Sequence, residues 1–511
     1  MSSTTNSSNA NNHSSSGKPD WHARAAALKI DGRPVIGGKR VETQDGQQFD
    51  CISPINGKSL GLVSRGQAAD VDAAVRAARS AFDDGRWSER PPAARKKILQ
   101  NFADKILAAK EELALLETLD MGKPIQYALG VDVPATARCI AWYGEAVDKI
   151  YDEIAPTGPN ALALIRREPM GVIGAIVPWN YPMIMSAWKL GPALAAGNSV
   201  VLKPSEKSPL TALRLAELAL EAGMPDGVFN VVPGYGHEAG EALALHMDVD
   251  AIGFTGSTRV GRKMLDYAGR SNLKRVYNEL GGKSAFLVFP DFDDLKRAAQ
   301  TVAGAMFFNQ GESCNAPSRV LVHDSVADEF VAMVAAEAPK YRPGDPLDPK
   351  TVMGAIVDEG QMRTVLAYIE GARAEGAQAR VGGQQVRGDS GGYFVEPTVF
   401  DGVTEGMTIA REEIFGPVLS VLRFKDEADA VRIANDSPFG LQASVWSSHI
   451  DRAHRVARKL RAGTVHVNQY DEDDITVPFG GYKQSGNGRD KSLHAFDKYT
   501  ELKTTWLRIN R

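Results

Sequence analysis

The 511-residue chain has few cysteines, no strong excess of charge of either sign and no long apolar run. The chain has three cysteines, Cys51, Cys139 and Cys314. This small and odd number argues against a disulfide framework and indicates a reducing compartment. The formal net charge of -4 provides no global field that would recruit nucleic acid. No segment is long and apolar enough to span a membrane, so we expect no membrane partner and a cytoplasmic location. The cysteines and histidines lack metal-ligand spacing, and we therefore predict no metal site.

The length of the chain favours several domains, roughly two to four. Hydrophobic residues make up 43% and charged residues 24%, which is typical of globular proteins. The first twenty residues are mostly Ser, Asn and Thr, and they lack both the apolar core of a secretory signal and the arginines of a transit peptide. We predict that residues 1–20 form a disordered tail.

Two sets of alternating strand and helix patterns follow a mostly helical region, which has helical spacing over 71–82 and 93–119. The first set has predicted strands at 171–177, 198–203, 228–232 and 251–254, with helices at 181–196, 209–222, 237–244 and 258–268. The second has strands at 319–322, 418–424 and 464–467, with helices at 327–338, 428–435 and 452–460. This alternation indicates an α/β protein with a doubly wound parallel sheet and a second α/β domain.

Cys314 is the strongest candidate for a catalytic residue, because it lies in a polar, glycine-containing segment, 308–315, rather than in an apolar run. Glu279 precedes it and is followed closely by Gly281 and Gly282. A thiolate is a good nucleophile, and a nearby carboxylate activates water, so the pair predicts covalent chemistry on a carbonyl. The alternative is that Cys314 is a small buried apolar residue, which is the commoner role of a free cysteine. Because Glu279 ends the first set and Cys314 belongs to the second, we expect the site in the cleft between two domains.

Three turns at strand ends carry weaker signals. Residues 256–261 connect a strand to a helix whose amides are able to hold a phosphate, and 203–206 end a strand at the edge where such sheets bind nucleotides. Asn180 follows another strand and is a candidate oxyanion donor. Each turn taken alone is equally consistent with a structural or solvated loop. The glycines of 234–240 miss the G-x-G-x-x-G spacing by one residue.

Six segments taken in order resemble the aldehyde dehydrogenase superfamily, and the resemblance covers nearly the whole chain after the tail. They are Pro178-Trp179-Asn180, Phe254-Thr255-Gly256-Ser257, Glu279-Leu280-Gly281-Gly282-Lys283, Cys314, Glu412-Glu413-Ile414-Phe415-Gly416-Pro417 and Pro478-Phe479-Gly480-Gly481-Tyr482-Lys483. The resemblance implies the aldehyde dehydrogenase fold, with a Rossmann-like NAD-binding domain (21–148 and 168–280), an α/β catalytic domain (281–485) and a small β oligomerisation element (149–167 and 486–511). The strand patterns at 161–166 and 500–509 suit that element, and the family implies a homodimer or homotetramer.

The resemblance also assigns roles. It implies that Cys314 is the nucleophile, that Glu279 is the general base, and that Asn180 and the backbone N–H of Cys314 form the oxyanion hole. NAD is the implied cofactor. The resemblance implies that Lys203 and Glu206 contact the adenosine ribose, Ser257 the pyrophosphate and Glu413 the nicotinamide ribose. The other residues implied to surround the cofactor are Trp179, Phe415, Ile176, Val177, Gly236, Gly256, Gly261 and Leu280.

One position departs from the family pattern. The family usually has Gly-Gln two residues before the cysteine, and this chain has Gly311-Glu312. A carboxylate facing the sulfur would raise the pKa of the thiol by like-charge repulsion. We expect Glu312 to point away from the sulfur.

The segment 480–494 resembles γ-glutamyl-γ-aminobutyraldehyde and 4-guanidinobutyraldehyde dehydrogenases, because Asp490-Lys491-Ser492 stands where many relatives have Glu-Leu-Gly. It implies an ω-amino, guanidino or γ-glutamyl-amino aldehyde from polyamine or arginine catabolism as substrate. Broad-specificity or betaine-type activity is the alternative. A CoA-acylating enzyme is disfavoured because such relatives generally have no glutamate at the position of Glu279. A non-catalytic protein is disfavoured because all three catalytic positions are filled.

The acidic run 471–474 precedes the segment that lines the substrate entrance in relatives. We predict that its carboxylates, Asp473 among them, attract a cationic tail, and that Asp132 adds to this attraction. A solvated loop without a role in specificity is the alternative. The apolar tunnel for the methylene chain is predicted from Tyr181, Met185, Trp188 and Phe479.

Overall fold

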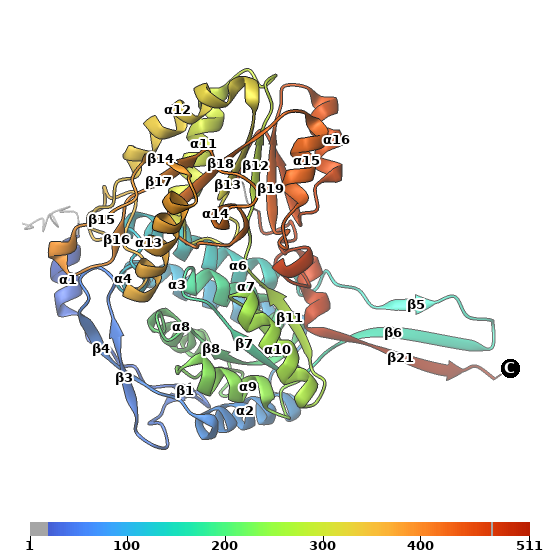
Figure 1. The fold of residues 1–511 in the computed structure, drawn as a ribbon. Helices are drawn as coiled ribbons and strands as arrows, with labels where there is room; N and C mark the ends of the chain where they lie inside the picture. The colour runs from blue at the N-terminus through green and yellow to red at the C-terminus, as the bar shows by residue number, and fades with distance from the viewer. Residues whose placement is uncertain (1–18, 472–473, 511) are drawn as a thin grey trace, which may run out of the picture.

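A computed structural model describes residues 19–471 and 474–510 and shows two α/β bodies with a long β arm (Figure 1). Residues 1–18 of the predicted tail lie outside the described residues. Asp20, which the prediction placed in the tail, instead caps α1 (Trp21–Ala27) by accepting a hydrogen bond from the Ala23 amide at 3.0 Å. None of the described helices has the length and apolar character required to cross a membrane.

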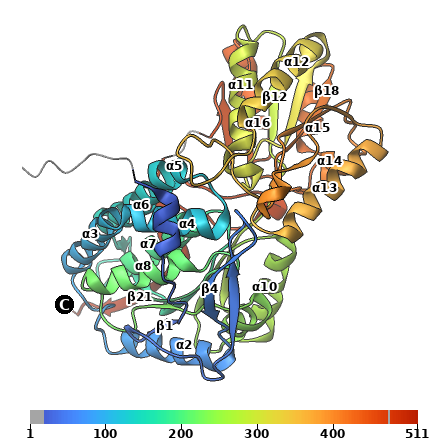
Figure 2. The ribbon, with the colours of Figure 1, turned by 90° about the vertical axis from the view of Figure 1, so that its left-hand side faces the viewer.

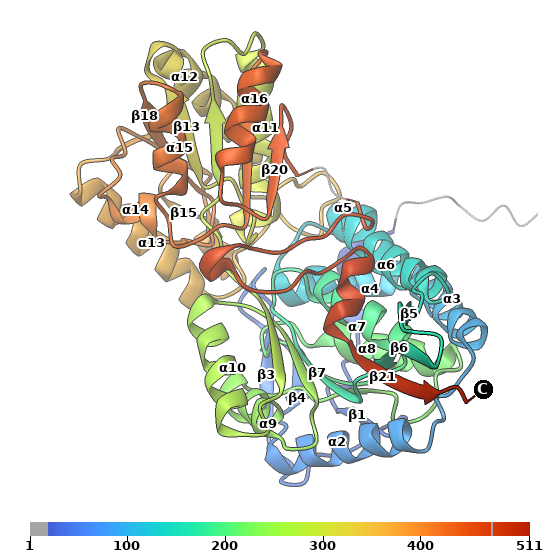
Figure 3. The same ribbon diagram turned by 90° about the vertical axis from the view of Figure 1, so that its right-hand side faces the viewer.

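The first body is the lower one in Figure 3, and it is built on a seven-stranded sheet with the order β11-β10-β7-β8-β9-β1-β2. Strands β11 to β9 in this order are parallel, and β1 and β2 add antiparallel at one edge. The strands are β1 (Val35–Ile36), β2 (Lys39–Arg40), β7 (Val172–Ile176), β8 (Ser199–Lys203), β9 (Phe229–Val231), β10 (Ala251–Thr255) and β11 (Arg275–Glu279). The predicted parallel α/β arrangement of this region is confirmed.

Helices cover both faces of this sheet, which is why its central strands are apolar throughout. Along β7, Val172 and Ile176 pack with α2 and α10, whereas Ile173 and Ala175 pack with α7 and α8. The helices are α2 (Ala68–Asp83), α7 (Pro182–Ala196), α8 (Leu210–Glu221), α9 (Glu241–Leu245) and α10 (Thr258–Arg270). A π-helical turn at Gly236–Gly240 precedes α9.

The mostly helical region that precedes β7 contains two helices where the sequence pattern over 93–119 predicted one. The helical pattern over 93–119 is divided into α3 (Pro92–Ala108) and α4 (Lys110–Met121), because Ala109 leaves the helical conformation at ψ 18°. Helix α4 ends at Gly122, whose φ of 85° requires the left-handed region that glycine adopts most readily. Then follow α5 (Ile125–Tyr127), a π-helical turn at Ala128–Asp132 and α6 (Val133–Ala146).

The second body is the upper one in Figure 2, and it contains a seven-stranded sheet with the order β14-β17-β18-β13-β12-β19-β20. Its strands are β12 (Ala285–Val288), β13 (Arg319–His323), β14 (Gln378–Val381), β17 (Thr398–Asp401), β18 (Val418–Phe424), β19 (Gln442–Trp446) and β20 (Thr464–Val467). Phe286 and Val288 of β12 pack with α11 and α12, and Ala285 and Leu287 pack on the opposite side with α13, α15 and α16. The helices are α11 (Leu295–Phe307), α12 (Ala327–Glu337), α13 (Glu359–Ala374), α14 (Thr408–Arg411), α15 (Glu427–Asn435) and α16 (Ile450–Lys459).

The arm projects from the first body as a three-stranded antiparallel sheet (Figure 1). It consists of β5 (Glu153–Ala155), β6 (Ala161–Pro169) and β21 (Thr500–Arg508), with Thr500 opposite Pro169 and Arg508 opposite Ala161. The predicted strands at 161–166 and 500–509 are thus confirmed. Two further hairpins are β3 (Gln48–Ile52) with β4 (Ser59–Ser64), and β15 (Gln385–Val386) with β16 (Phe394–Val395). Cys51 is the fourth residue of β3.

The predicted domain boundaries remain a prediction. The C-terminal segment contacts the first body before it enters the arm. The predicted oligomerisation element begins at residue 486, yet the chain reaches the arm only at Thr500. Before that, Asn487 bonds to the backbone of β11, and the turn Leu493–Lys498 packs on α7. Residues 487–498 therefore support the first body and the site described next.

Candidate active site

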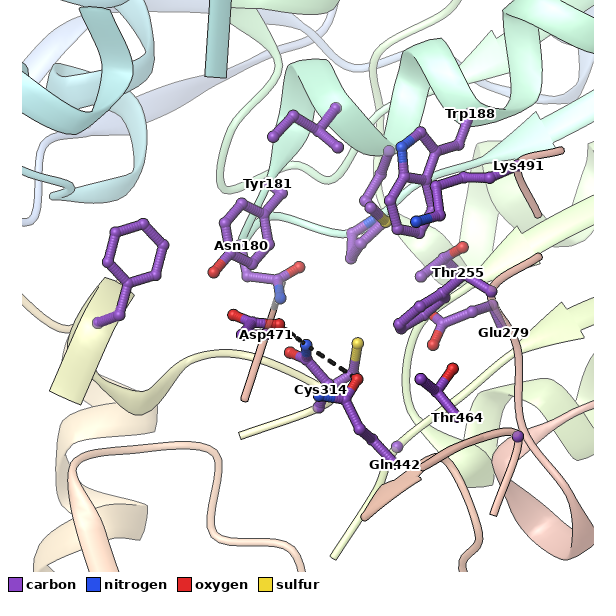
Figure 4. A pocket seen from close by; sticks show the side chains of 18 of the residues that line it. Asn180, Tyr181, Trp188, Thr255, Glu279, Cys314, Gln442, Thr464, Asp471 and Lys491 are labelled. Atoms are coloured by element: carbon purple, nitrogen blue, oxygen red, sulfur yellow. Dashed lines mark hydrogen bonds between the residues drawn. The ribbon is translucent and has the colours of Figure 1, made fainter. Parts of the chain in front are cut away.

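A pocket of about 980 Å³ lies between the two bodies and is lined by residues from both (Figure 4). The first body contributes the segments that follow the carboxyl ends of β7 and β10, and the last residue of β11, as expected for ligand sites of parallel α/β sheets. The second body contributes Cys314 and the segment around Glu413. The volume falls within the range of small-molecule sites, roughly 300–1,000 Å³.

Cys314 and Glu279 both reach this pocket, which brings together the predicted nucleophile and base. Cys314 is partly buried and unoxidised, and it follows a turn in which Asn309, Gln310 and Gly311 all have positive φ angles. Burial is the main cause that raises the pKa of the Cys314 thiol well above its usual range, and the nearby Glu279 carboxylate raises it further. The thiol is therefore held protonated until a base or a positive charge comes close.

Glu279 has the properties of a base that is kept out of water. Its two carboxylate oxygens have no hydrogen-bond partner among the described residues. Burial raises the pKa of Glu279 to about 8, Lys189 opposes this shift, and Asp490 adds to it. A carboxylate with a pKa near the working pH is suited to accept a proton from water.

A buried cluster of three charges, Lys189, Asp490 and Lys498, acts on Glu279. Lys189 Nζ lies 2.5 Å from Asp490 Oδ2, and Lys498 pairs with the other carboxylate oxygen. All three side chains are almost fully buried, and Lys189 and Lys498 both interact electrostatically with Glu279. From the sequence, Asp490 was interpreted only as a mark of a branch of the family, and neither Lys189 nor Lys498 was predicted to belong to the site.

Asn180 supports the loop that carries the nucleophile. Its Nδ2 donates to the Glu312 carbonyl at 2.9 Å, and Asn309 Nδ2 donates to the Asn180 carbonyl at 3.0 Å. The Asn180 side chain also lines the pocket beside Cys314 (Figure 4). An amide in this position is suited to donate to an oxyanion, and the oxyanion role remains a prediction.

Glu312 points away from the sulfur, as expected. Its Oε1 accepts from the Val357 amide at 3.1 Å, and the side chain is fully buried. Burial raises the pKa of Glu312 well above its usual range, so the group is held neutral. The departure from the family's Gly-Gln pair thus adds no charge next to Cys314.

Asp132 does not lie where it was predicted. It is fully buried and paired with Lys123, and it is not part of the pocket wall. Lys123 Nζ lies 4.2 Å from the centre of the Tyr181 ring, whose hydroxyl is 2.6 Å from Ser313 Oγ. Asp132 is thus separated from the pocket by Lys123 and Tyr181, because the π-helical turn directs its side chain into the core.

The cofactor end of the pocket is lined by aromatic and polar groups. The rings of Trp179 and Phe415 meet edge to face with centroids 5.2 Å apart, and Phe415 has the strained φ of 57°. Glu413 Oε1 accepts from the Gly282 amide at 3.0 Å. Gly256 and Ser257 line the wall at the start of α10, where Ser257 is the N-cap residue.

Other predicted cofactor residues lie outside the pocket wall. Lys203 and Glu206 form an ion pair of 3.2 Å at the end of β8. Gly261 allows α10 to pack against Leu280, since a Cβ there would come within 2.5 Å of the Leu280 side chain. The remaining residues outside the wall are Ile176 and Val177, which are buried, and Gly236, which begins a π-helical turn.

The substrate end combines a predicted apolar tunnel with unpredicted cations. Tyr181, Met185, Trp188 and Phe479 all line the wall, and the last two rings have centroids 5.1 Å apart. Of the acidic run, Asp471 lines the wall, Asp474 bonds to Thr476, and the predicted Asp473 lies outside the described residues. Arg138 and Lys491 also line the wall, so the prediction of an acidic entrance is incomplete.

The described residues contain no group of three or more His, Cys, Asp or Glu side chains that is arranged to hold a metal ion. The reactive groups at the site are the Cys314 thiol, carboxyl groups and cationic side chains. The arrangement is therefore suited to covalent catalysis by Cys314 with water activated by Glu279.

Comparison with known proteins identifies close relatives along nearly the whole chain. The model of the aldehyde dehydrogenase family matches residues 41–505. The NADP/NAD-dependent aldehyde dehydrogenase PuuC of Escherichia coli (strain K12) is 52% identical over 489 residues, covering 96% of this chain and 98% of that protein. Two similar crystal structures are an indole-3-acetaldehyde dehydrogenase complexed with NAD+ (58% identity) and the γ-glutamyl-γ-aminobutyraldehyde dehydrogenase of Burkholderia cenocepacia J2315 (57% identity). Each has a TM-score of 0.95 and covers 96% of this chain and 99% of the other.

Proposed function

The chain belongs to the aldehyde dehydrogenase family, and we propose that it oxidises an ω-amino, guanidino or γ-glutamyl-amino aldehyde of polyamine or arginine catabolism. It is an NAD-dependent aldehyde dehydrogenase, and the product is the corresponding carboxylic acid. The observation that carries the proposal is the shared pocket, in which Cys314 and Glu279 lie between an aromatic cofactor end and an apolar substrate end.

The residues at the cofactor end fit NAD. The Trp179 and Phe415 rings offer a surface for the nicotinamide, and Glu413 offers a carboxylate to ribose hydroxyls. The start of α10 at Ser257 provides backbone amides and a positive helix end for the pyrophosphate. When bound, NAD supplies the hydride acceptor for the oxidation.

The remaining steps belong to the residues of the chain. The Cys314 thiolate forms a C–S bond to the aldehyde carbon, and the carbonyl oxygen becomes an oxyanion. Asn180 and the Cys314 backbone N–H donate to this oxyanion, and one such donor contributes ~3 kcal/mol at comparable sites. After oxidation to the thioester, Glu279 removes a proton from water, which attacks the acyl carbon and releases the acid and the thiolate.

The substrate class is supported by both the pocket and the relatives. The tunnel of Met185, Trp188 and Phe479 suits a methylene chain, and one similar crystal structure is named for a γ-glutamyl-amino aldehyde. Another is named for indole-3-acetaldehyde, which keeps broad specificity as the second candidate.

We also propose a homodimer or homotetramer, assembled through the arm. Ile154, Leu502 and Trp506 are apolar and strongly exposed on its strands, with exposed fractions of 71%, 61% and 66%. Leu502 and Trp506 share one face of the arm and Ile154 lies on the other, so both faces expose apolar side chains of the kind that mark an interaction surface. A cytoplasmic location is proposed on the basis of the three free cysteines.

A panel of aldehydes of equal length, with neutral, cationic and γ-glutamyl tails, tests the proposed function. We expect NAD reduction with several of them, the highest kcat/KM with a charged tail, and no activity in Cys314→Ala. NAD reduction that is absent with every aldehyde, or that persists in Cys314→Ala, would overturn the proposal.

A further inference from the structure

A buried ammonium group lies behind the wall of the substrate tunnel. Lys123 follows Gly122, the left-handed residue that ends α4, and its side chain is fully buried. Its Nζ pairs with Asp132 of the π-helical turn and lies 3.8 Å from Glu117 Oε1 of α4. The side chains of this cluster do not line the pocket, so the reaction proposed above leaves them without a role.

The cluster carries one positive and one negative charge. Burial raises the pKa of Glu117 well above its usual range, so this carboxyl group is neutral and Asp132 is the counter-ion of Lys123. Neither carboxyl oxygen of Glu117 has a hydrogen-bond partner among the described residues. A buried ion pair is often no more stabilising than apolar side chains of similar volume, because removing two charges from water is costly. Stability of the fold alone therefore does not account for a cation at this place.

The ring of Tyr181 separates this cation from the substrate. Lys123 Nζ lies 4.2 Å from the ring centre, and the same ring lines the pocket (Figure 4). An ammonium group is attracted to the negative face of an aromatic ring, and the attraction is strongest where water is excluded. Because Lys123 is fully buried, its charge holds the ring in place in the tunnel wall.

The hydroxyl of Tyr181 connects this ring to the nucleophile. It lies 2.6 Å from Ser313 Oγ, and Ser313 directly precedes Cys314. The loop needs such contacts, because Asn309 and Gln310 in the preceding turn have positive φ angles of 49° and 59°, which are unfavourable for residues other than glycine. A series of contacts thus runs from the buried cation through the ring and the serine hydroxyl to the residue that carries the reactive sulfur.

We propose that Lys123 is a positioning residue for the attack by Cys314, and that it acts through the Tyr181 ring and the Ser313 hydroxyl. The inference rests on the proposed reaction at Cys314 and adds a residue that lies outside the pocket wall. The cation fixes the ring, the ring fixes the hydroxyl, and the hydroxyl keeps the sulfur within reach of the aldehyde carbon. Loss of the cation therefore slows formation of the acyl-enzyme. It leaves the affinity for NAD unchanged, because the cofactor end of the pocket is not part of this series of contacts.

The rate of NADH formation in a single turnover, with enzyme and NAD in excess over hexanal, measures formation of the acyl-enzyme. Lys123→Met should lower this rate several-fold. Tyr181→Phe, which keeps the ring and removes the hydroxyl, should lower it by at least as much. The double variant should be no slower than Tyr181→Phe alone, because both changes break the same series of contacts. A wild-type rate in Lys123→Met, or effects that multiply in the double variant, would overturn the inference.

A second buried lysine separates positioning from a general loss of stability. Lys274 Nζ donates to the Ala244 carbonyl at 2.7 Å, and its side chain is buried outside the pocket wall. Lys274→Met should lower the melting temperature and leave the single-turnover rate unchanged. Equal slowing in Lys274→Met and Lys123→Met would assign the effect to stability and contradict the inference.

Lys123→Met leaves Asp132 buried without its counter-ion, so the cation is also removed together with its partner. Lys123→Met/Asp132→Leu replaces the ion pair by apolar side chains, a change that commonly preserves the fold. This variant should show the same slow single turnover and an unchanged dissociation constant for NAD. A wild-type rate in this folded variant would overturn the inference even if Lys123→Met does not fold.

Cys314→Ala separates this result from the proposed function. If wild type forms NADH and Cys314→Ala does not, the reaction stands and the Lys123 variants alone decide the inference. If wild type forms no NADH, or Cys314→Ala forms it at the same rate, the proposed function fails and the inference falls with it.

Discussion

The Glu279 carboxylate and the Cys314 thiol face the same pocket from different bodies of the molecule, and each affects the titration of the other (Figure 4). Glu279 raises the pKa of the Cys314 thiol, and its own pKa is raised to about 8 by burial. Nucleophile and base are thus both held in their protonated forms at neutral pH. The consequences of this relationship are measurable.

The hydrolysis step should depend on pH through Glu279. The raised pKa means that the carboxylate is protonated below about pH 8 and then cannot accept a proton from water. The rate of acyl-enzyme decay should therefore rise with pH, by about tenfold per unit well below pH 8, and level off above it. Rapid-quench measurement of decay at several pH values checks this, separately from acylation. A decay rate that is flat between pH 6 and pH 9 would contradict the assignment of Glu279.

Removal of Lys498 should destabilise the fold and raise the pKa of Glu279. Lys498 is buried and paired with Asp490, and a hydrogen bond to a charged group contributes ~1.5–3 kcal/mol. Lys498→Met should lower the free energy of unfolding by about that amount and move the pH dependence of acyl-enzyme decay to higher pH, because a positive charge near Glu279 is lost. Lys97→Met, at an exposed lysine of α3 outside the pocket and the arm, is the control and should change neither. An unaltered pH dependence in a folded Lys498→Met enzyme would rule out this influence on Glu279.

Tyr181 and Ser313 should act as a unit in positioning Cys314. The Tyr181 hydroxyl lies 2.6 Å from Ser313 Oγ, one residue before the nucleophile. Tyr181→Phe and Ser313→Ala should each lower the acylation rate by several-fold, and the double variant should be no slower than the slower single variant. Pre-steady-state kinetics of the four enzymes measures this coupling. Independent, multiplying effects would show that the contact does not position the nucleophile.

NAD should be preferred to NADP because Glu206 would face a 2′-phosphate with a like charge. Lys203, 3.2 Å from Glu206, moderates the effect, so we expect a preference and not exclusion. Glu206→Gln should raise kcat/KM for NADP relative to NAD, and both values come from initial rates with one aldehyde. If the ratio stays the same in Glu206→Gln, the carboxylate does not select the cofactor.

The sequence predicted much of the fold because local patterns there agree with the tertiary structure. The buried strands β7, β8 and β10 and the helices between them follow from apolar runs bounded by turn residues. The division of the 93–119 region was not predicted, because Ala109 is itself a good helix former and only the packing of α3 and α4 sets the break.

The catalytic residues of the site were predictable because a cysteine or a glutamate has a characteristic reactivity of its own. Cys314 in a polar segment and Glu279 before two glycines predicted a nucleophile and a base, and the structure places both in one pocket. Asp132 was misplaced because a sequence does not show which way a π-helical turn directs its side chain. Lys491 was overlooked because a lysine in a charged segment does not reveal that it lies against two aromatic rings.

The most direct test of the account is mass spectrometry of the Glu279→Gln enzyme, mixed with NAD and an aldehyde and quenched within one turnover. The account predicts that an acyl group accumulates on the peptide containing Cys314, because the thioester forms and its hydrolysis is slowed. It predicts no such adduct in Cys314→Ala. An unmodified Cys314 peptide in a Glu279→Gln enzyme that turns over at the wild-type rate would contradict the account.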